Sequence, residues 1–439
     1  MASDEKKEIS VVPQSPPSSI RVGSIKLAAA GDDFEVFKQT TDGVQFRLVG
    51  WIKASVIFLK PLNTYFAIVQ GNFRNSHAQC HSIADMAYVV GGPVVREICG
   101  FLFIVAYVLC AGSGIVGLSV GFNALSEHAA CTVWWALLAY VAVVASASVR
   151  KFEKIGWLSW AGFASVYVAV FVVVVGVTTR DRPAAAPPVG EYDFGYHAIA
   201  YPSFMVGMTA SATIFVSSAG TSAFLPVISE MKNPRDYNKS VYLCMSIVQA
   251  SYLTFSLVVY AYCGKWVTDP SLGSAGPLIK KIAYGIGLIG LMVSGCLYLH
   301  VAAKYVFVRI LRNSPHLQRN SAIHWGTWFG CTIGLGSLSF VLAQAIPIFS
   351  FLIALTGSVC FAPIAICLPA WLWLHDHGDW KRGGVMKKAA YYGHWLLILL
   401  GVFLCIGGTY AVINSIITSY ASGLIGSAFS CADNSGTVH

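Results

Sequence analysis

The sequence predicts an all-α protein that crosses a membrane many times. Of its 439 residues, 56% are apolar and only 11% are charged, and the mean hydropathy is +0.64. A soluble domain carries about a quarter charged residues, so this chain has too few to cover a water-facing surface. The apolar residues also run unbroken, as in 166–177, whereas the strands of a membrane β-barrel alternate apolar and polar residues. Helices are therefore the expected spanning elements.

The first 47 residues differ from the rest of the chain. They contain Pro13, Pro16 and Pro17 together with several acidic residues, and this composition predicts a disordered tail. No basic segment followed by a short apolar core opens the chain, so a cleavable signal peptide is not expected.

A spanning helix needs about 20 mostly apolar residues. Nine segments meet this requirement and are expected to form a transmembrane domain within 48–420. They are approximately 97–122, 131–148, 155–177, 205–228, 241–263, 282–303, 324–346, 348–374 and 391–420. A tenth stretch, 48–70, contains Lys53, Lys60 and Pro61, and a lysine near the bilayer centre costs a few kcal/mol. It is a poor span.

The lysine and arginine residues predict the orientation, because short cytoplasmic loops are enriched in both. If 97–122 starts inside, the inside loops carry 14 basic residues and the outside loops carry five. The C-terminal segment 421–439 then lies outside and carries none. The N-terminal tail carries six basic residues and is expected in the cytosol.

This orientation leaves a parity problem at 48–70. Basic residues flank the segment on both sides, so both flanks favour the cytoplasm, and one crossing cannot join two inside ends. The segment could enter the membrane and return, lie on its surface, or be a fused remnant of two helices.

Hydroxyl side chains gather around a glycine in 205–228. They are Ser211, Thr213, Ser217, Ser218, Thr221 and Ser222, around Gly220. An unwound turn there would direct free backbone N–H and C=O groups at a polar substrate. The second interpretation is that small residues let two helices pack closely. Close packing is the preferred interpretation for the glycines of 97–122.

His300 is the one titratable side chain, other than cysteine and tyrosine, deep in a predicted span. Its charge changes near neutral pH, which would suit proton coupling. A neutral histidine hydrogen-bonded to a neighbouring helix is the alternative. Tyr298 shares the segment and could line the same cavity.

The sequence contains no catalytic or metal-binding motif of the usual kinds. No aspartate or glutamate lies deep in a predicted span, which argues against a metal site. We therefore expect no enzyme activity, no cofactor, no metal and no nucleic-acid partner. The lipid bilayer is the expected surrounding.

Three of the twelve cysteines approach the outer face in this topology, namely Cys131, Cys263 and Cys431. A disulfide between Cys131 and Cys431 would suit an oxidising exterior. Unpaired thiols are the alternative.

Four segments carry a resemblance to a known family. They are SEMKNPRDYNKS (229–240), SAGPLIKKIAYGI (274–286), AAKYVFVRILRNS (302–314) and AQAIPIFSFLIALTGS (343–358). In their order and spacing the chain resembles the fungal neutral and aromatic amino acid permeases of the amino acid/auxin permease family, from about Phe73 to Cys431.

The resemblance implies a five-plus-five inverted-repeat transporter fold with an eleventh helix. It also implies proton-coupled uptake of neutral amino acids by alternating access, with the substrate held by unwound backbone in the first and sixth helices. The sixth-helix site then falls on Ser217, Ser218, Ala219, Gly220 and Thr221, with Tyr298 as a further lining residue. The plasma membrane is the expected location, with the vacuolar membrane as the alternative.

The chain departs from the family pattern after GWIKASVIFLK (50–60). Lys60 is followed at once by PLNTYFAIVQGNFRN, which resembles the end of the second helix. About 30 residues are missing by this comparison, roughly one crossing and a turn. The first two helices are therefore expected to be incomplete, and the alternative function is a transport-dead amino acid sensor or membrane scaffold.

Overall fold

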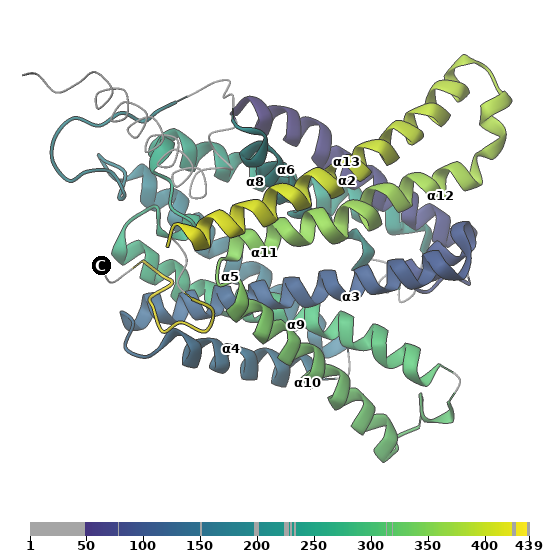
Figure 1. Cartoon of the computed structure of the whole chain (residues 1–439), viewed down its shortest axis with the longest axis horizontal. Coiled ribbons are helices and arrows are strands. Elements are labelled where there is room, and N and C mark those ends of the chain that lie inside the picture. The colour runs from purple at the N-terminus through teal and green to yellow at the C-terminus, as the bar shows by residue number, and fades with distance from the viewer. Residues whose placement is uncertain are drawn as a thin grey trace, which may run out of the picture.

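The computed structural model describes residues 49–77, 79–149, 152–196, 202–223, 228, 231, 234–312, 314–317, 319–423 and 427–436, with no side-chain description for 49–60 and 152–156. The expected N-terminal tail, 1–47, lies outside these residues. The described part of the chain is a bundle of long helices without strands (Figure 1).

Four helices form the first part of the bundle. They are α2 (Val49–Ser76), α3 (Ile83–Ser126), α4 (Thr132–Ala147) and α5 (Phe152–Thr178). α3 begins with a capping box, in which Ser82 Oγ accepts from the Asp85 N–H and the Asp85 carboxylate accepts from the Ser82 N–H. α4 has only 16 residues, fewer than the roughly 20 expected of a span.

The second part begins with a helix that stops early. The elements are α6 (Phe204–Val216), α8 (Tyr237–Cys263), α9 (Pro277–Leu311), α10 (Ala322–Ala345), α11 (Phe349–Leu355), α12 (Leu368–Asp376) and α13 (Val385–Ala421). Short 3₁₀ turns are η1 (Gly220–Ala223), η2 (Pro234–Asp236), η3 (Gly264–Trp266), η4 (Ser271–Gly273), η5 (Pro315–Leu317) and η8 (Gly378–Arg382).

The predicted span 348–374 is a broken helix. Two π-helical segments, η6 (Thr356–Phe361) and η7 (Pro363–Cys367), separate α11 from α12. The halves Phe349–Phe361 and Pro363–Asp376 meet at 44°. Pro363 lacks a backbone N–H, and a proline ring in a helix clashes with the carbonyl oxygen four residues earlier, which accounts for a bend at this point.

The described residues contain seven helices that are long and apolar enough to cross a membrane, and the bent pair α11–α12 adds one more. All nine sequence-predicted ranges overlap a helix or a broken helix. The chain is a multi-pass integral membrane protein.

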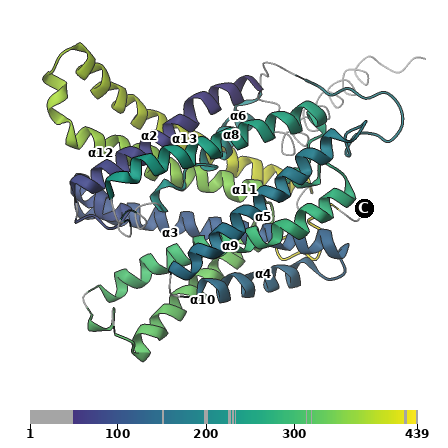
Figure 2. The same cartoon turned by 180° about the vertical axis from the view of Figure 1, so that it is seen from behind.

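The two ends of the bundle are marked by different contacts. At what we call the basic end, Arg312 after α9 lies 3.6 Å from Asp85 at the start of α3, and His77 after α2 lies 3.9 Å from Asp376 at the end of α12. At the opposite end, the disulfide end, Cys131 is joined to Cys431. Figures 1 and 2 show the helices running between these two ends.

The packing of the helices shows an inverted repeat. α3 packs on α4 and α10, and α9 packs on α10 and α4. α5 covers α9, while α11 contacts α3. α3 runs from the basic end to the disulfide end and α9 runs back, as an inverted repeat requires of these two helices. α13 follows as an additional helix.

The small residues of α3 serve the packing that the sequence indicated. A Cβ atom built on Gly114 would lie 2.9 Å from the Cα of Gly295 on α9, and one on Gly112 would lie 3.0 Å from the Ser339 carbonyl oxygen on α10. Side chains at these positions would push the helices apart. Close contact of the central helices therefore depends on these glycines.

One helix, α2, stands where the family pattern has two. It is continuous from Val49 to Ser76 with Pro61 inside, neither a return loop nor a hairpin. Its Asn72 and Thr64 pair with Asn238 and Gln249 of α8, at 3.0 and 2.9 Å, so α2 and α8 run antiparallel. α2 therefore leads into the basic end, where His77 follows it. The stretch 48–70, expected as a return loop, a surface segment or a fused remnant of two helices, lies from residue 49 onward within this one helix.

Candidate functional site

The helix α6 breaks in the hydroxyl-rich segment. Its last helical residue is Val216, and 3₁₀ geometry resumes at Gly220. The Ser217 N–H donates to the Thr213 carbonyl oxygen at 3.3 Å, and the Ala219 N–H donates to the Val216 carbonyl oxygen at 3.0 Å, which closes the helix with a tighter turn. Serine and glycine favour helix ends over helix interiors, so the break lies where the composition is least helical.

Open space adjoins the break at Gly220. A Cβ atom built on this glycine would meet no atom within 4 Å. The next residue, Thr221, is 1% exposed, and its Oγ1 has no hydrogen-bond partner among the described residues. A buried hydroxyl without a partner costs about 1–3 kcal/mol, which a bound water or a polar ligand would offset.

Asn63 of α2 reaches the break, although the sequence analysis did not select it. Its Nδ2 donates to the Phe215 carbonyl oxygen at 3.1 Å and to Ser218 Oγ at 3.0 Å. Asn63 is 1% exposed, and its Oδ1 has no partner among the described residues. The signal in the sequence was an amide in the middle of the apolar stretch 48–70.

Tyrosines from three other helices surround the same segment. The Tyr107 hydroxyl on α3 lies 3.0 Å from Ser222 Oγ, and the Tyr252 hydroxyl on α8 donates to the Ser217 carbonyl oxygen at 3.4 Å. The ring of Tyr298 on α9 lies 5.8 Å from that of Tyr107. Tyr107 and Tyr252 are further residues that sequence reasoning missed.

The site formed by these residues contains no charged side chain. Its polar groups are amides, hydroxyls and the backbone of the break, and its apolar walls are aromatic, including Phe361 at 6.2 Å from the Tyr107 ring. Such a surface can bind a small zwitterion through hydrogen bonds and an apolar side chain through its aromatic walls.

His300 does not face the break. Its Nδ1 lies 3.1 Å from the Ala147 carbonyl oxygen at the end of α4, and its ring packs edge-on against Trp328 of α10 at 5.2 Å. Trp328 in turn donates from Nε1 to the Ser148 carbonyl oxygen at 2.8 Å. This placement fits a histidine that joins three helices, the alternative weighed from the sequence.

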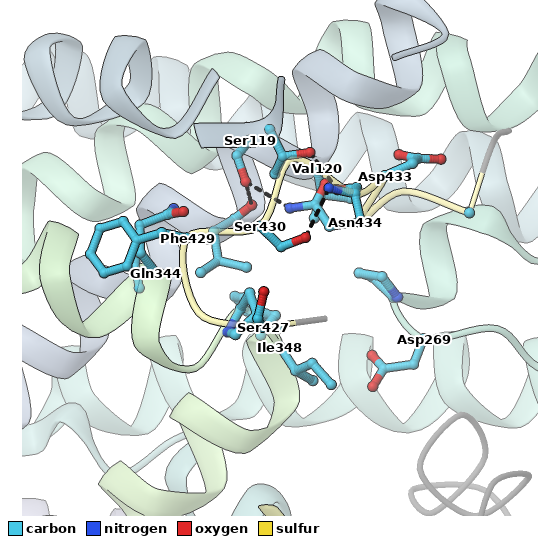
Figure 3. A pocket seen from close by; sticks show the side chains of 18 of the residues that line it. Ser119, Val120, Asp269, Gln344, Ile348, Ser427, Phe429, Ser430, Asp433 and Asn434 are labelled. Atoms are coloured by element: carbon cyan, nitrogen blue, oxygen red, sulfur yellow. Dashed lines mark hydrogen bonds between the residues drawn. The ribbon is translucent and has the colours of Figure 1, made fainter. Parts of the chain in front are cut away.

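A cavity of about 320 Å³ lies apart from the break, at the disulfide end. The C-terminal segment 427–436 lines it together with Val116 and Ser119 of α3, Gln344 and Ile348. Figure 3 shows Ser119 beside Asn434 of this segment. Val116 follows Tyr107 by nine residues, about 13 Å along a helix, so this cavity is further out than the break.

The C-terminal segment is held in place by polar contacts as well as by a disulfide. Asn434 accepts from Asn123 Nδ2 at 2.8 Å. It donates to Ser119 Oγ at 3.0 Å (Figure 3). Thr132 Oγ1 donates to the Ala432 carbonyl oxygen at 2.7 Å. The disulfide joins Cys131 to Cys431, the pair that the sequence analysis considered, whereas Cys263 is a free buried thiol.

Comparison with protein families gives one match that spans most of the chain. Residues 34–414 match the model of the family described as transmembrane amino acid transporter protein. The chain belongs to this family. It is therefore an amino acid transporter rather than an enzyme, and its resemblance to amino acid permeases is confirmed.

Curated relatives agree with this assignment. A transmembrane transporter of Gibberella moniliformis is 45% identical, over 93% of this chain and 92% of its own length. The N amino acid transport system protein of Neurospora crassa is 25% identical, over 84% of this chain and 78% of its own. Among solved structures, that of MhsT in complex with L-phenylalanine matches with a TM-score of 0.47 and 11% identity, over 87% of this chain and 94% of MhsT.

The alignment with the Gibberella transporter bears on the expected gap. It spans 438 positions but only 93% of the 439 residues of this chain, so about 30 positions have no residue here. This total is close to the length of the segment that the family pattern has after Lys60. In the described part of the chain, α2, α3, α4 and α5 precede α6.

Proposed function

We propose that this transporter carries neutral amino acids, aromatic ones included, together with protons and by alternating access. The amino and carboxylate groups of the substrate bind the unwound backbone from Ser217 to Thr221, and its side chain lies against Tyr107 and Tyr298. Asn63 takes part from α2, in place of the unwound first helix of the family.

The observation that carries this proposal is the open space at Gly220, together with two buried oxygens, Thr221 Oγ1 and Asn63 Oδ1, that have no hydrogen-bond partner among the residues that the structure describes. Thr221 Oγ1 can accept from the substrate amino group or donate to its carboxylate, and Asn63 Oδ1 can accept from the amino group. An uncharged site binds the ammonium and carboxylate groups of a neutral amino acid through hydrogen bonds. An additional charge on a substrate side chain would lose its hydration there without a partner of opposite charge.

The other parts of the proposal have separate support. Alternating access agrees with the inverted relation of the two repeats, because rocking of one repeat against the other exposes a midplane site to each side in turn. The family resemblance supports proton coupling and a location in the plasma membrane rather than the vacuolar membrane. The distribution of basic residues supports a cytosolic N-terminus. The name of the Neurospora relative, an amino acid transport system protein, is in keeping with the substrate class.

Uptake by the purified protein in liposomes tests the proposal. We expect saturable accumulation of radiolabelled phenylalanine, and this accumulation should rise when the outer buffer is acidified. Unlabelled neutral amino acids should inhibit phenylalanine uptake far better than lysine or glutamate does. Binding without accumulation would instead support the sensor alternative, and equal inhibition by lysine would contradict the neutral specificity.

A further inference from the structure

A cluster of metal-ligating side chains lies at the basic end of the bundle, far from the break. His77 follows α2, and His375 and Asp376 end α12. One donor atom from each of the three lies within 4.8 Å of the other two. α2 and α12 pack against each other, so the fold itself brings together residues that are about 300 positions apart in the chain.

The distances suit one ion. Asp376 Oδ1 lies 3.0 Å from His375 Nδ1 and 3.9 Å from His77 Nε2. In a tetrahedral zinc site with ligands at 2.0–2.2 Å, the donor atoms lie about 3.3–3.6 Å apart. The two distances to Asp376 Oδ1 fall on either side of this range, and the widest separation, at most 4.8 Å, would close by about 1 Å through rotation of the exposed His375 and Asp376 side chains. The side chains of His77 and Asp376 are 23% and 26% exposed, which leaves access from water.

His77 is oriented for this role by its own surroundings. Its Nδ1 lies 3.1 Å from the Phe73 carbonyl oxygen, and its ring stacks on that of Phe73 at 4.1 Å. A histidine whose Nδ1–H donates to a carbonyl presents an unprotonated Nε2 to a metal, which is the usual arrangement in metal sites. The Phe73 carbonyl therefore selects the tautomer that a ligand requires.

We propose that His77, His375 and Asp376 bind a divalent transition-metal ion, with Zn²⁺ as the tested species. Two imidazole nitrogens and one carboxylate oxygen form a donor set typical of zinc and other first-row metals, and water completes the coordination. A bound ion joins the ends of α2 and α12 at the basic end. Because α2 also carries Asn63, the ion anchors the helix that reaches the break.

The test uses the full chain, purified without a histidine tag, and measures Zn²⁺ by equilibrium dialysis and Co²⁺ by its visible absorption. We expect about one tightly bound ion per chain and a Co²⁺ spectrum of a site with nitrogen and oxygen ligands. His77→Gln and Asp376→Asn should each weaken binding at least about tenfold. Zn²⁺ should also raise the melting temperature of the unaltered chain but not that of His77→Gln.

His81→Gln is the matched control, because it removes an exposed imidazole from the same connection and lies outside the cluster. It should bind Zn²⁺ as the unaltered chain does. The proposal is wrong if the unaltered chain retains no more Zn²⁺ than His77→Gln, or if His81→Gln loses as much as His77→Gln does. The Co²⁺ spectrum of the unaltered chain decides the matter even if a variant fails to fold.

Discussion

Asn63 Nδ2 lies 3.0 Å from Ser218 Oγ and 3.1 Å from the Phe215 carbonyl oxygen, so one side chain of α2 satisfies two groups of the broken α6. The contact links the shortened first repeat directly to the unwound segment of the second. It is the feature through which the site can remain assembled although one helix stands where two are expected.

Replacing Asn63 should weaken both the fold and the transport. In Asn63→Ala the buried Phe215 carbonyl loses its side-chain donor, at a cost of about 1–3 kcal/mol. We expect a lower melting temperature and a higher KM for uptake. Asn72→Ala is the control, because it removes an exposed amide of the same helix that pairs with Asn238 at 3.0 Å. Equal effects of the two substitutions would argue against a special role for Asn63.

Filling the space at Gly220 should abolish uptake without unfolding the protein. A Gly220→Leu side chain has open space to occupy, and it would take the place of the substrate. Gly330→Leu on α10 is matched, because a Cβ atom there also meets no atom within 4 Å. We expect normal expression of both variants and uptake only by Gly330→Leu. Undiminished uptake by Gly220→Leu would place the substrate elsewhere.

The disulfide should hold two distant parts of the chain together after cleavage. Cleavage at a protease site inserted after Val189, which is 85% exposed, places Cys131 and Cys431 on different fragments of the chain. We expect the two fragments to migrate together on a non-reducing gel and apart after reduction. Cys131→Ser should separate them without a reductant. Separate migration of the cysteine-containing fragments would mean that the thiols are unpaired.

His300→Gln should leave the pH dependence of uptake intact. The His300 ring is bonded to the Ala147 carbonyl oxygen and packed on Trp328, away from the break. We expect a lower melting temperature, since the glutamine packs less well against Trp328, with the same ratio of uptake at acidic and neutral pH. A flat pH profile in a folded variant would instead assign proton coupling to His300.

The side of the membrane on which the N-terminus lies can be measured with an epitope tag. Its six basic residues favour the cytosol, so we expect a tag before residue 1 to be protected in intact cells. α2 as a single crossing favours the opposite side, because its C-terminal end lies at the basic end. An accessible tag would show that the single helix, rather than the charge distribution, sets the topology.

The sequence was sufficient for the class of protein and for the break. Unbroken apolar runs can only be buried in a bilayer as helices, and the Ser217–Gly220 run is too rich in small polar residues to continue one. Both are local properties. The approximate positions of the nine predicted spans follow in the same way, because span length depends on the thickness of the bilayer alone.

Other features were decided only by the tertiary structure. Asn63 adjoins the break because α2 packs against α6, and Tyr107 adjoins it because its hydroxyl reaches Ser222 of η1. No spacing along the chain indicates these contacts. His77 meets Asp376 for the same reason, because two helix ends coincide at one end of the bundle. His300 turns toward Ala147 while Tyr298, two residues earlier, points to Tyr107, because positions two apart lie on different faces of a helix. The sequence determines which residues each helix can bury. The neighbouring helices determine which face of the helix is buried.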